Sequence, residues 1–316
     1  MTFRPARLLD SIAQISSREW NALAGASQPF LRHEFLLALE ESGCAAPRTG
    51  WEPKHLVIED SAGKAVAAMP LFRKAHSRGE FVFDFSWAGA YAQHGLKYYP
   101  KLLTAVPFTP VSGPRIFVAP HADSKALTKL AARSVIDYAK NAQLSSWHVL
   151  FPSEETASDL DRAGLILRRD CQFHWFNHGY DSFESFLANF TAEKRKKAKR
   201  ERRRVAEAGI EFDTRHGQDM DAALWRVVYG FYADTFHRHG HEPYLNLDFF
   251  MRIAAVMPNE IMLKVARIGA EPIAVAIFFV GSDALYGRYW GAGGNFHSLH
   301  FEACYYQGIE YCIEKG

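Results

Sequence analysis

A cation and a glycine-rich run lie close together near the end of the sequence. Arg288 is followed by Trp290, Gly291 and Gly293 in the order R-x-x-G-x-G. Glycines let backbone N–H groups approach phosphate oxygens, and a following helix N-terminus favours anions. The spacing therefore predicts contact with a pyrophosphate or another part of a substrate. An ordinary turn is the alternative, because turns are also rich in glycine.

Three titratable side chains follow this run. His300 is the candidate general base, ahead of His297, because its reference pKa is near neutrality. Glu302 falls in the first turn of a helix expected over residues 301–314, where a carboxylate suits contact with a substrate amine. Tyr305 could protonate a leaving group. Together they fit acyl transfer to an amine, which needs removal of a proton and stabilisation of an oxyanion. Capping or solvated histidines and a half-buried tyrosine are the alternative.

The first half of the sequence holds a second set of aromatic and cationic side chains. Its members are Trp87, Tyr91, Tyr98, Tyr99, Lys101 and Arg115. A groove lined by aromatic rings and two cations would suit a glycan or a phosphorylated acceptor. The alternative is an aromatic core with exposed cations.

A basic segment, residues 191–208, concentrates the positive charge of the chain. Residues 191–207 carry nine Lys or Arg and three Glu, although the formal net charge of the whole chain is only +2. Cations packed this closely repel one another and attract anions, so Lys194, Lys197, Arg200 and Arg203 are candidates for binding nucleic acid or phosphate. The alternative is a solvated helix face.

Composition places the chain among globular proteins. It has 316 residues, of which 48% are hydrophobic. The first ten residues lack the apolar stretch of a signal peptide, and the longest apolar run is too short to span a bilayer, so we expect a cytoplasmic protein. The four cysteines form no CxxC pair, and no matched set of ligands predicts a metal.

The elements that must position these side chains occur in the same order twice. In the first half we expect a helix over residues 33–43, strands over 54–60 and 64–74 joined by a tight turn, and a third strand over 80–91. In the second half we expect a helix over 247–257, strands over 260–268 and 271–281, and a third strand over 283–294. A helix, an antiparallel hairpin and a third strand in each half predict a duplicated α/β unit.

The remaining elements lie between the two copies. We expect helices over 124–142, 154–163, 183–190 and 220–237, a basic helix within 191–208, and strands over 147–151, 165–175 and 209–215. These elements predict two domains, residues 1–177 and 178–316. A further strand should pair after the last helix, so we expect the second domain to be truncated at its C-terminus.

Several strings resemble one family. The strings are residues 33–43 (HEFLLALEESG), 79–91 (GEFVFDFSWAGAY), 98–115 (YYPKLLTAVPFTPVSGPR), 287–291 (GRYWG) and 299–316 (LHFEACYYQGIEYCIEKG). They are similar to the FemAB-like peptidoglycan biosynthesis/recognition proteins of the GNAT acyltransferase superfamily. The resemblance implies mixed α/β sheets in a tandem pair of GNAT-like domains. It also implies a basic helical insertion, and the R-x-x-G-x-G spacing is the one by which acetyl-CoA-dependent GNAT enzymes bind pyrophosphate.

The function that this resemblance implies is N-acyl transfer. The donor would be acyl-CoA or aminoacyl-tRNA, used as a co-substrate, with no tightly bound cofactor. The acceptor would be an amine, such as a peptidoglycan precursor, and tRNA would bind through the basic helix. The alternative is a non-catalytic, degenerate GNAT pair that recognises a cell-wall precursor or RNA.

Overall fold

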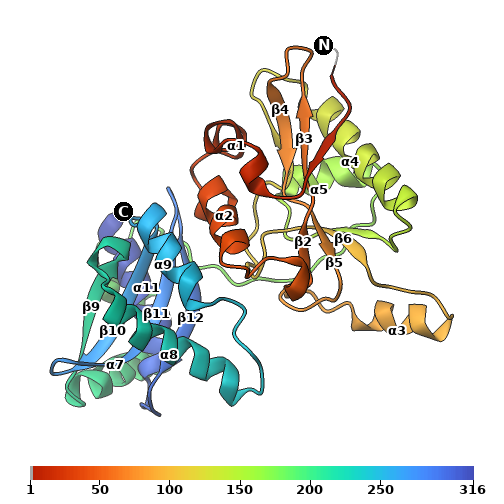
Figure 1. Ribbon diagram of the computed structural model, residues 1–316. Helices are drawn as coiled ribbons and strands as arrows, with labels where there is room; N and C mark the ends of the chain where they lie inside the picture. Colours follow the sequence, from red (N-terminus) through yellow and green to blue (C-terminus); the bar gives the residue numbers. More distant parts are fainter. Residues whose placement is uncertain (1–2) are drawn as a thin grey trace. The chain divides into compact units, whose positions relative to one another are not determined.

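The chain folds into two compact units, Met1–Arg169 and Asp170–Gly316. The computed structural model describes residues 3–316 (Figure 1). Each unit combines antiparallel strands with covering helices, as the repeated order of elements predicts. The two are described below as unit 1 and unit 2.

Unit 1 contains two four-stranded sheets. Their orders are β1-β3-β4-β7 and β2-β5-β6-β8, with β6 and β8 parallel and every other pair antiparallel. The strands are β1 (Arg7–Leu9), β2 (Trp51–Pro53), β3 (His55–Glu59), β4 (Ala65–Met69), β5 (Phe72–Lys74), β6 (Lys101–Thr104), β7 (Phe117–Val118) and β8 (Trp147–Val149).

The two sheets follow one another along the same stretches of chain. Only Lys54 separates β2 from β3, and residues 70–71 separate β4 from β5. The N–H of Lys54 still donates to the carbonyl of Leu71 at 2.8 Å, so pairing continues across the break. Pro53 and Pro70 lie at the two breaks, and a proline has no N–H to donate to the hydrogen-bond ladder of the sheet. The expected hairpin is therefore present, but it is interrupted in both strands.

Helices cover the sheets of unit 1. They are α1 (Ser17–Ala24), α2 (His33–Glu41), α4 (Ser124–Asn141) and α5 (Glu154–Arg162), with short helices η1 (Ile12–Gln14), η2 (Pro29–Leu31) and η3 (Pro47–Thr49). Leucine, alanine and valine side chains of α4 pack with those of β3 and β4 in one apolar core. On α1, the buried Trp20 indole donates to the carbonyl of Leu31 at 2.8 Å, which ties α1 to η2.

Two expected strands of the first half are wrong. The third strand over 80–91 is replaced by a turn and the helix α3 (Phe85–Gln93), because Asp84 is held by buried partners and Phe83 and Phe85 point to solvent. The third strand of the repeat is instead β6 with β7. Residues 165–175 form no strand, because Arg168, Arg169 and Asp170 interrupt the apolar pattern.

Unit 2 is built on one antiparallel sheet in the order β12-β11-β10-β9. Its strands are β9 (Ile210–His216), β10 (Ile261–Ile268), β11 (Glu271–Val280) and β12 (Leu285–Ala292). Its helices are α6 (Phe183–Ala188), α7 (Ala192–Glu207), η4 (Gly217–Asp219), α8 (Ala222–Arg238), α9 (Leu247–Val256), α10 (Leu299–Phe301), the π-helix η5 (Glu302–Tyr306) and α11 (Gln307–Lys315). These elements confirm the expected ones to within a few residues.

Helices pack against both faces of the last strand, β12. On one face, Tyr289 contacts the rings of Tyr232 on α8 and Phe250 on α9. On the other face, Trp290 packs in two apolar clusters. One of them contains Val205 of α7, and the other contains Ala303 of η5. The pairing skips Arg288, because Ile277 opposes Tyr289 and Phe278 opposes Gly287. The bulge at Arg288 therefore interrupts the regular alternation of side chains between the two faces of β12.

Candidate functional site

A hollow of about 550 Å³ in unit 2 brings a predicted catalytic residue next to the basic helix. It is lined by Arg202, Arg203, Val205 and Ala206 of α7, by Ile210, Glu211 and Phe212 on the β9 side, and by Glu302 and Gln307. Two predicted residues, Glu302 and Arg203, thus share one hollow although they are far apart in the sequence. Its lining holds two arginines and two carboxylates, so the hollow could hold the phosphate and the amine of a polar ligand.

Glu302 is buried and ion-paired. Its Oε2 accepts from Nε of Arg202 at 3.2 Å, and its Oε1 accepts from Nε2 of Gln307 at 2.8 Å. Arg202 also donates to Oε2 of Glu310 at 2.8 Å. Burial alone would lower the pKa of Arg202, but the hydrogen bonds and charges of Glu310 and Glu302 raise it above the ordinary value. Glu302 therefore fixes α7 to the π-helix through its pairing with Arg202, a role that the sequence did not predict.

His300, two residues before Glu302 in the sequence, lies among aromatic side chains. Its ring is edge-on to Trp290 at 5.4 Å between centroids and to Tyr305 at 6.0 Å. His300 is exposed, but partial burial of its ring lowers its pKa and so favours the neutral imidazole. Tyr305 stacks on Phe301 and is half exposed. Three predicted site residues, His300, Tyr305 and Trp290, are thus brought together, while the Nδ1 of His297 is hydrogen-bonded to the hydroxyl of Ser298 at 2.6 Å.

The two glycines of the R-x-x-G-x-G run have a packing explanation. A Cβ on Gly291 would lie 2.2 Å from the backbone of Phe231, so only glycine lets β12 approach α8 this closely. At Gly293 a Cβ would lie 2.9 Å from the Phe231 ring, and the N–H of Gly293 donates to the carbonyl of Ile273. The Arg288 guanidinium lies over the Tyr289 ring at 5.1 Å. Pyrophosphate binding by this run stays a prediction.

The basic helix α7 presents most of its cations to solvent. Thr191 caps it by accepting from the N–H of Lys194. The exposed cations include all four predicted phosphate-binding residues, Lys194, Lys197, Arg200 and Arg203. Carboxylates of the same helix lie near two of them, Glu201 at 3.8 Å from Lys197 and Glu207 at 3.5 Å from Arg203. Arg202 points the other way and anchors the helix, so the exposed row is held in a fixed orientation.

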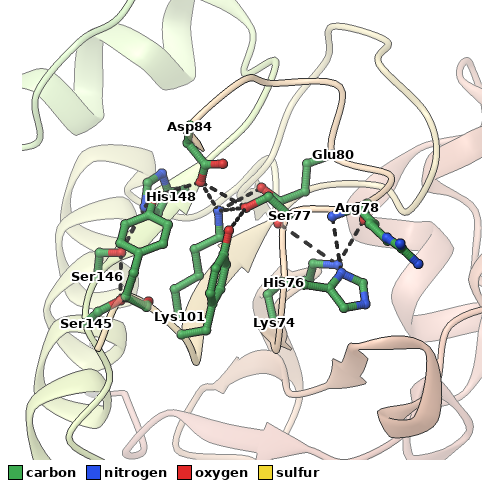
Figure 2. Close-up of polar contacts among 12 residues, drawn as sticks. Lys74, His76, Ser77, Arg78, Glu80, Asp84, Lys101, Ser145, Ser146 and His148 are labelled. Carbon is green, nitrogen blue, oxygen red and sulfur yellow. Dashed lines mark hydrogen bonds and ion pairs between the residues drawn. The ribbon is translucent and has the colours of Figure 1, made fainter. Parts of the chain in front are cut away.

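Unit 1 holds a buried polar cluster at the start of β6 (Figure 2). The Nζ of Lys101 donates to Oδ2 of Asp84 at 2.5 Å, to Oε2 of Glu80 at 2.8 Å and to Oγ of Ser77 at 3.1 Å. Asp84 also accepts from the hydroxyl of Tyr98 at 2.7 Å. Burial alone would raise the pKa of Asp84, but the hydrogen bonds from Lys101, Tyr98 and Ser77 hold it below the ordinary value.

A second lysine belongs to the same cluster. The ammonium of Lys74 lies 3.7 Å from the Trp51 ring centroid and 4.0 Å from Oε1 of Glu80. Burial lowers the pKa of Lys74 to about 7, because desolvation outweighs the attraction of Glu80, and burial likewise raises the pKa of Glu80. With both lysines fully buried, the cluster fixes the chain around it.

The sequence predicts three members of this cluster, Tyr98, Tyr99 and Lys101, but not the charged residues around them. The hydroxyl of Tyr99 is 2.8 Å from Oγ of Ser77, so Tyr99 does belong to the cluster. The missed members are Lys74, Glu80, Asp84 and His148. A signal existed for two of them, since Lys74 ends an apolar strand and Asp84 interrupts the run FVFDF. Charges within apolar runs indicate buried ion pairs.

The other predicted residues of unit 1 are not brought to one groove. Arg115 is fully buried and donates to the carbonyls of Leu150, Pro114 and Val111. Trp87 and Tyr91 lie on α3, where Trp87 is 43% exposed and the Tyr91 ring contacts Tyr98. Substrate contact by Trp87, Tyr91, Tyr99, Lys101 and Arg115 stays a prediction.

Family membership follows from the sequence match over nearly the whole chain. Residues 11–316 match the FemAB-like family, which is described as peptidoglycan biosynthesis/recognition. The chain belongs to this family. No curated protein matches the sequence.

Solved structures agree with the fold of a FemAB-like protein. The C-terminal domain of a lysylphosphatidylglycerol synthetase from Agrobacterium fabrum is similar with a TM-score of 0.52 and 11% identity, over 97% of this chain and 77% of that one. FemX is similar with a TM-score of 0.52 and 12% identity, over 96% of this chain and 85% of FemX. A conserved protein of unknown function from Bacteroides thetaiotaomicron is similar with a TM-score of 0.51 and 11% identity, over 95% and 85% of the two chains. These likenesses establish the fold, a tandem pair of GNAT-like α/β domains.

Proposed function

We propose that this FemAB-like protein is an N-acyltransferase that takes an aminoacyl group from a charged tRNA and passes it to an amine of a peptidoglycan precursor. The observation that carries the proposal is the exposed row of cations on α7, held next to the Glu302 hollow by Arg202. A fixed cationic row beside a polar hollow fits a polyanionic donor whose reactive end enters the hollow. The FemAB-like family description supports the cell-wall acceptor.

In this proposal His300 accepts the proton of the attacking amine. The amine nitrogen bonds to the carbonyl carbon of the aminoacyl ester, and the bond from that carbon to the ribose oxygen breaks. The ribose oxygen leaves with a proton, for which Tyr305 is the candidate donor. The burial that lowers the pKa of His300 keeps the imidazole in the neutral form that a base requires. Glu302 orients the site through Arg202 and does not accept the proton itself.

An acyl-CoA donor is the alternative within the same reaction class. It rests on the R-x-x-G-x-G spacing, and both glycines of that run are explained by packing against Phe231. Calorimetric titration of acetyl-CoA decides between the donors. Saturable binding that Arg288→Ala weakens would favour CoA, and no heat would favour tRNA.

The test of the proposal uses charge reversal on α7. The triple variant Lys197→Glu, Arg200→Glu and Arg203→Glu should bind aminoacyl-tRNA at least about a hundredfold more weakly and with a shallower salt dependence, since each phosphate contact contributes to the slope of log K against log salt. The matched control reverses Lys125, Lys129 and Arg133, three exposed cations of α4 in unit 1. Equal tRNA binding by the two triple variants would contradict the proposal.

A second measurement separates catalysis from binding alone. His300→Ala should lower the rate of aminoacyl transfer to a muropeptide amine by roughly 10²–10⁴-fold while tRNA binding is unchanged. If no transfer occurs with the unaltered protein but tRNA or precursor binds tightly, the non-catalytic binding module is the correct function.

A further inference from the structure

The chain between β5 and β6 exposes an unusual number of large apolar side chains. This segment, residues 75–100, is called the α3 excursion below. Phe81, Phe83, Phe85, Trp87 and Leu96 are 44%, 77%, 69%, 43% and 60% exposed, respectively. Exposed apolar side chains are common singly, but a contiguous group marks an interaction surface.

The helix of the excursion has no buried residue, although the Tyr91 ring contacts Tyr98. Every residue of α3 is at least partly exposed. In Figure 1 α3 stands away from β5 and β6, the two strands that the excursion joins. The rings of Phe83 and Phe85 lie 6.2 Å apart between centroids at the start of this helix. The apolar surface is therefore carried on a projecting element, which can enter another medium, and is not a recess that would receive a ligand.

The base of the excursion is firmly attached. Ser77, Glu80 and Asp84 near its beginning and Tyr98 near its end all meet Lys101 or its partners in the buried cluster of Figure 2. Lys74, the last residue of β5, donates to the carbonyl of Arg78 at 3.2 Å. Both ends of the excursion are thus tied to one buried point, which holds the aromatic part outward.

The charges of the excursion complete the pattern. Its two carboxylates, Glu80 and Asp84, are buried and paired with Lys101. Its other two charged side chains, Arg78 and Lys97, are exposed cations. The outer surface of the excursion is therefore aromatic and cationic. Aromatic side chains favour the headgroup region of a bilayer, and exposed cations favour anionic lipids.

We propose that residues 81–96 insert into the interface of an anionic lipid bilayer and hold unit 1 at the membrane surface. Insertion would bury the rings of Phe83, Phe85 and Trp87 among acyl chains near the headgroups, with Arg78 and Lys97 at the phosphates. Within residues 3–316, no helix is long and apolar enough to cross a bilayer, so the contact is interfacial. The inference does not depend on the donor or the acceptor of the proposed reaction.

The test is flotation of the full chain with vesicles. The unaltered protein should float with vesicles of equal parts phosphatidylglycerol and phosphatidylcholine, and much less with phosphatidylcholine alone. The triple variant Phe83→Ser, Phe85→Ser and Trp87→Ser should partition at least about tenfold more weakly. Its thermal unfolding should be unchanged, because all three side chains are exposed. Brominated lipids should quench tryptophan fluorescence in the unaltered protein, and Trp87→Phe should remove most of that quenching.

A matched control removes the same number of exposed apolar side chains elsewhere. Val227→Ser, Met251→Ser and Val256→Ser change residues of α8 and α9 that are 42%, 42% and 51% exposed. This variant should float like the unaltered protein. The double variant Arg78→Glu and Lys97→Glu should lose the preference for phosphatidylglycerol.

Three results would overturn the inference. One is that the unaltered protein fails to bind either kind of vesicle. Another is that the aromatic and control triple variants bind equally well. The third is that the aromatic triple variant converts a dimer to a monomer in sedimentation without changing flotation, which would make the surface an interface between two copies of the chain.

Discussion

The two units use the same pairing of a helix with an antiparallel hairpin, yet they treat charge in opposite ways. Unit 1 buries Lys74, Lys101, Glu80, Asp84 and Arg115. Unit 2 buries Glu302 and most of Lys264, and its nine lysines and arginines within residues 191–207 lie along one surface helix. The two units also differ in the regularity of their hairpins. In unit 1 both strands are interrupted, whereas β10 and β11 pair over their whole length with one register shift.

The difference shows what each unit does with its ion pairs. In unit 1 the buried ion pairs hold segments that have no regular ladder of backbone hydrogen bonds, and the α3 excursion is the main example. The regular ladder of unit 2 needs no such support, so its cations remain available for anions in solvent. Substitutions in the two units should therefore differ in their cost to stability.

Lys101→Met should lower the free energy of unfolding of unit 1 by roughly 3–5 kcal/mol, because it leaves Glu80 and Asp84 buried without their shared cation. Hydrogen exchange of the β4 and β6 amides measures this value for unit 1 by itself. Lys97→Met, an exposed lysine of the same excursion, is the control and should change stability by less than about 0.5 kcal/mol. A loss below about 1 kcal/mol for Lys101→Met would mean that the cluster does not hold the excursion.

Acid should weaken unit 1 through His148, whose Nε2 lies 3.2 Å from the hydroxyl of Tyr98. Burial, reinforced by the charge of Lys101, lowers the pKa of His148 from 6.5 to about 4. Below about pH 6.5, His148 binds a proton in the unfolded chain but stays neutral in the folded chain. The free energy of unfolding therefore decreases as the pH falls from 6.5 toward 4. The loss should approach about 2–3 kcal/mol.

The contribution of His148 is isolated by His148→Gln. Urea unfolding at pH 7 and pH 4.5 should show a smaller loss in this variant than in the unaltered protein. Equal losses in the two proteins would assign the acid sensitivity to other groups.

Gly291→Ala should destabilise unit 2 by about 1–3 kcal/mol, since the new methyl group would overlap the backbone of Phe231. Gly287→Ala is the matched control on the same strand, because a Cβ there meets Phe278 at an ordinary 3.5 Å. The two unfolding curves should differ mainly in their midpoints. If Gly291→Ala instead leaves stability unchanged and abolishes binding of acetyl-CoA, this glycine serves a ligand and not packing.

The smallest effect is expected at a surface pair of unit 2. Lys199 lies 2.6 Å from Glu184, a separation like those in the buried cluster, but both side chains are at least half exposed. Lys199→Met should therefore lower the free energy of unfolding by only about 0.2–1 kcal/mol, and less at high salt. A cost comparable to that of Lys101→Met would remove the contrast between the units.

The fold of unit 2 could be predicted from the sequence almost element by element. Its strands have long apolar runs, such as IMLKVARI and EPIAVAIFFV, and its helices have capping residues such as Asp221 and Asn246. Unit 1 was harder. The alternation FVFDF indicates a strand locally, but Asp84 is drawn inward by Lys101, seventeen residues later, and the phenylalanines turn outward. A contact of that separation leaves no periodic signal.

The candidate site shows the same limit. His300, Trp290 and Tyr305 are near in sequence, and their proximity in the structure could be predicted. The pairing of Glu302 with Arg202 joins residues a hundred positions apart, and Arg202 differs from its cationic neighbours only in the face of α7 on which it lies. A step of one residue, about 100° around the helix axis, decides which arginine is the anchor, and the sequence run KRERRR does not reveal it.

Helical phase also explains why the last helix contains a π turn. Residues eight apart in a regular α-helix point roughly 80° away from each other. Arg202 nevertheless bonds to both Glu302 and Glu310, with the wider turn of Glu302–Tyr306 between them. The wider turn absorbs part of that rotation and brings the two carboxylates onto one side, while Ala303 stays packed in the sheet core. The extra residue in this turn thus rotates Glu302 and Glu310 toward the same side of the helix. Because both carboxylates bind Arg202, this rotation also sets the direction in which the cationic face of α7 points.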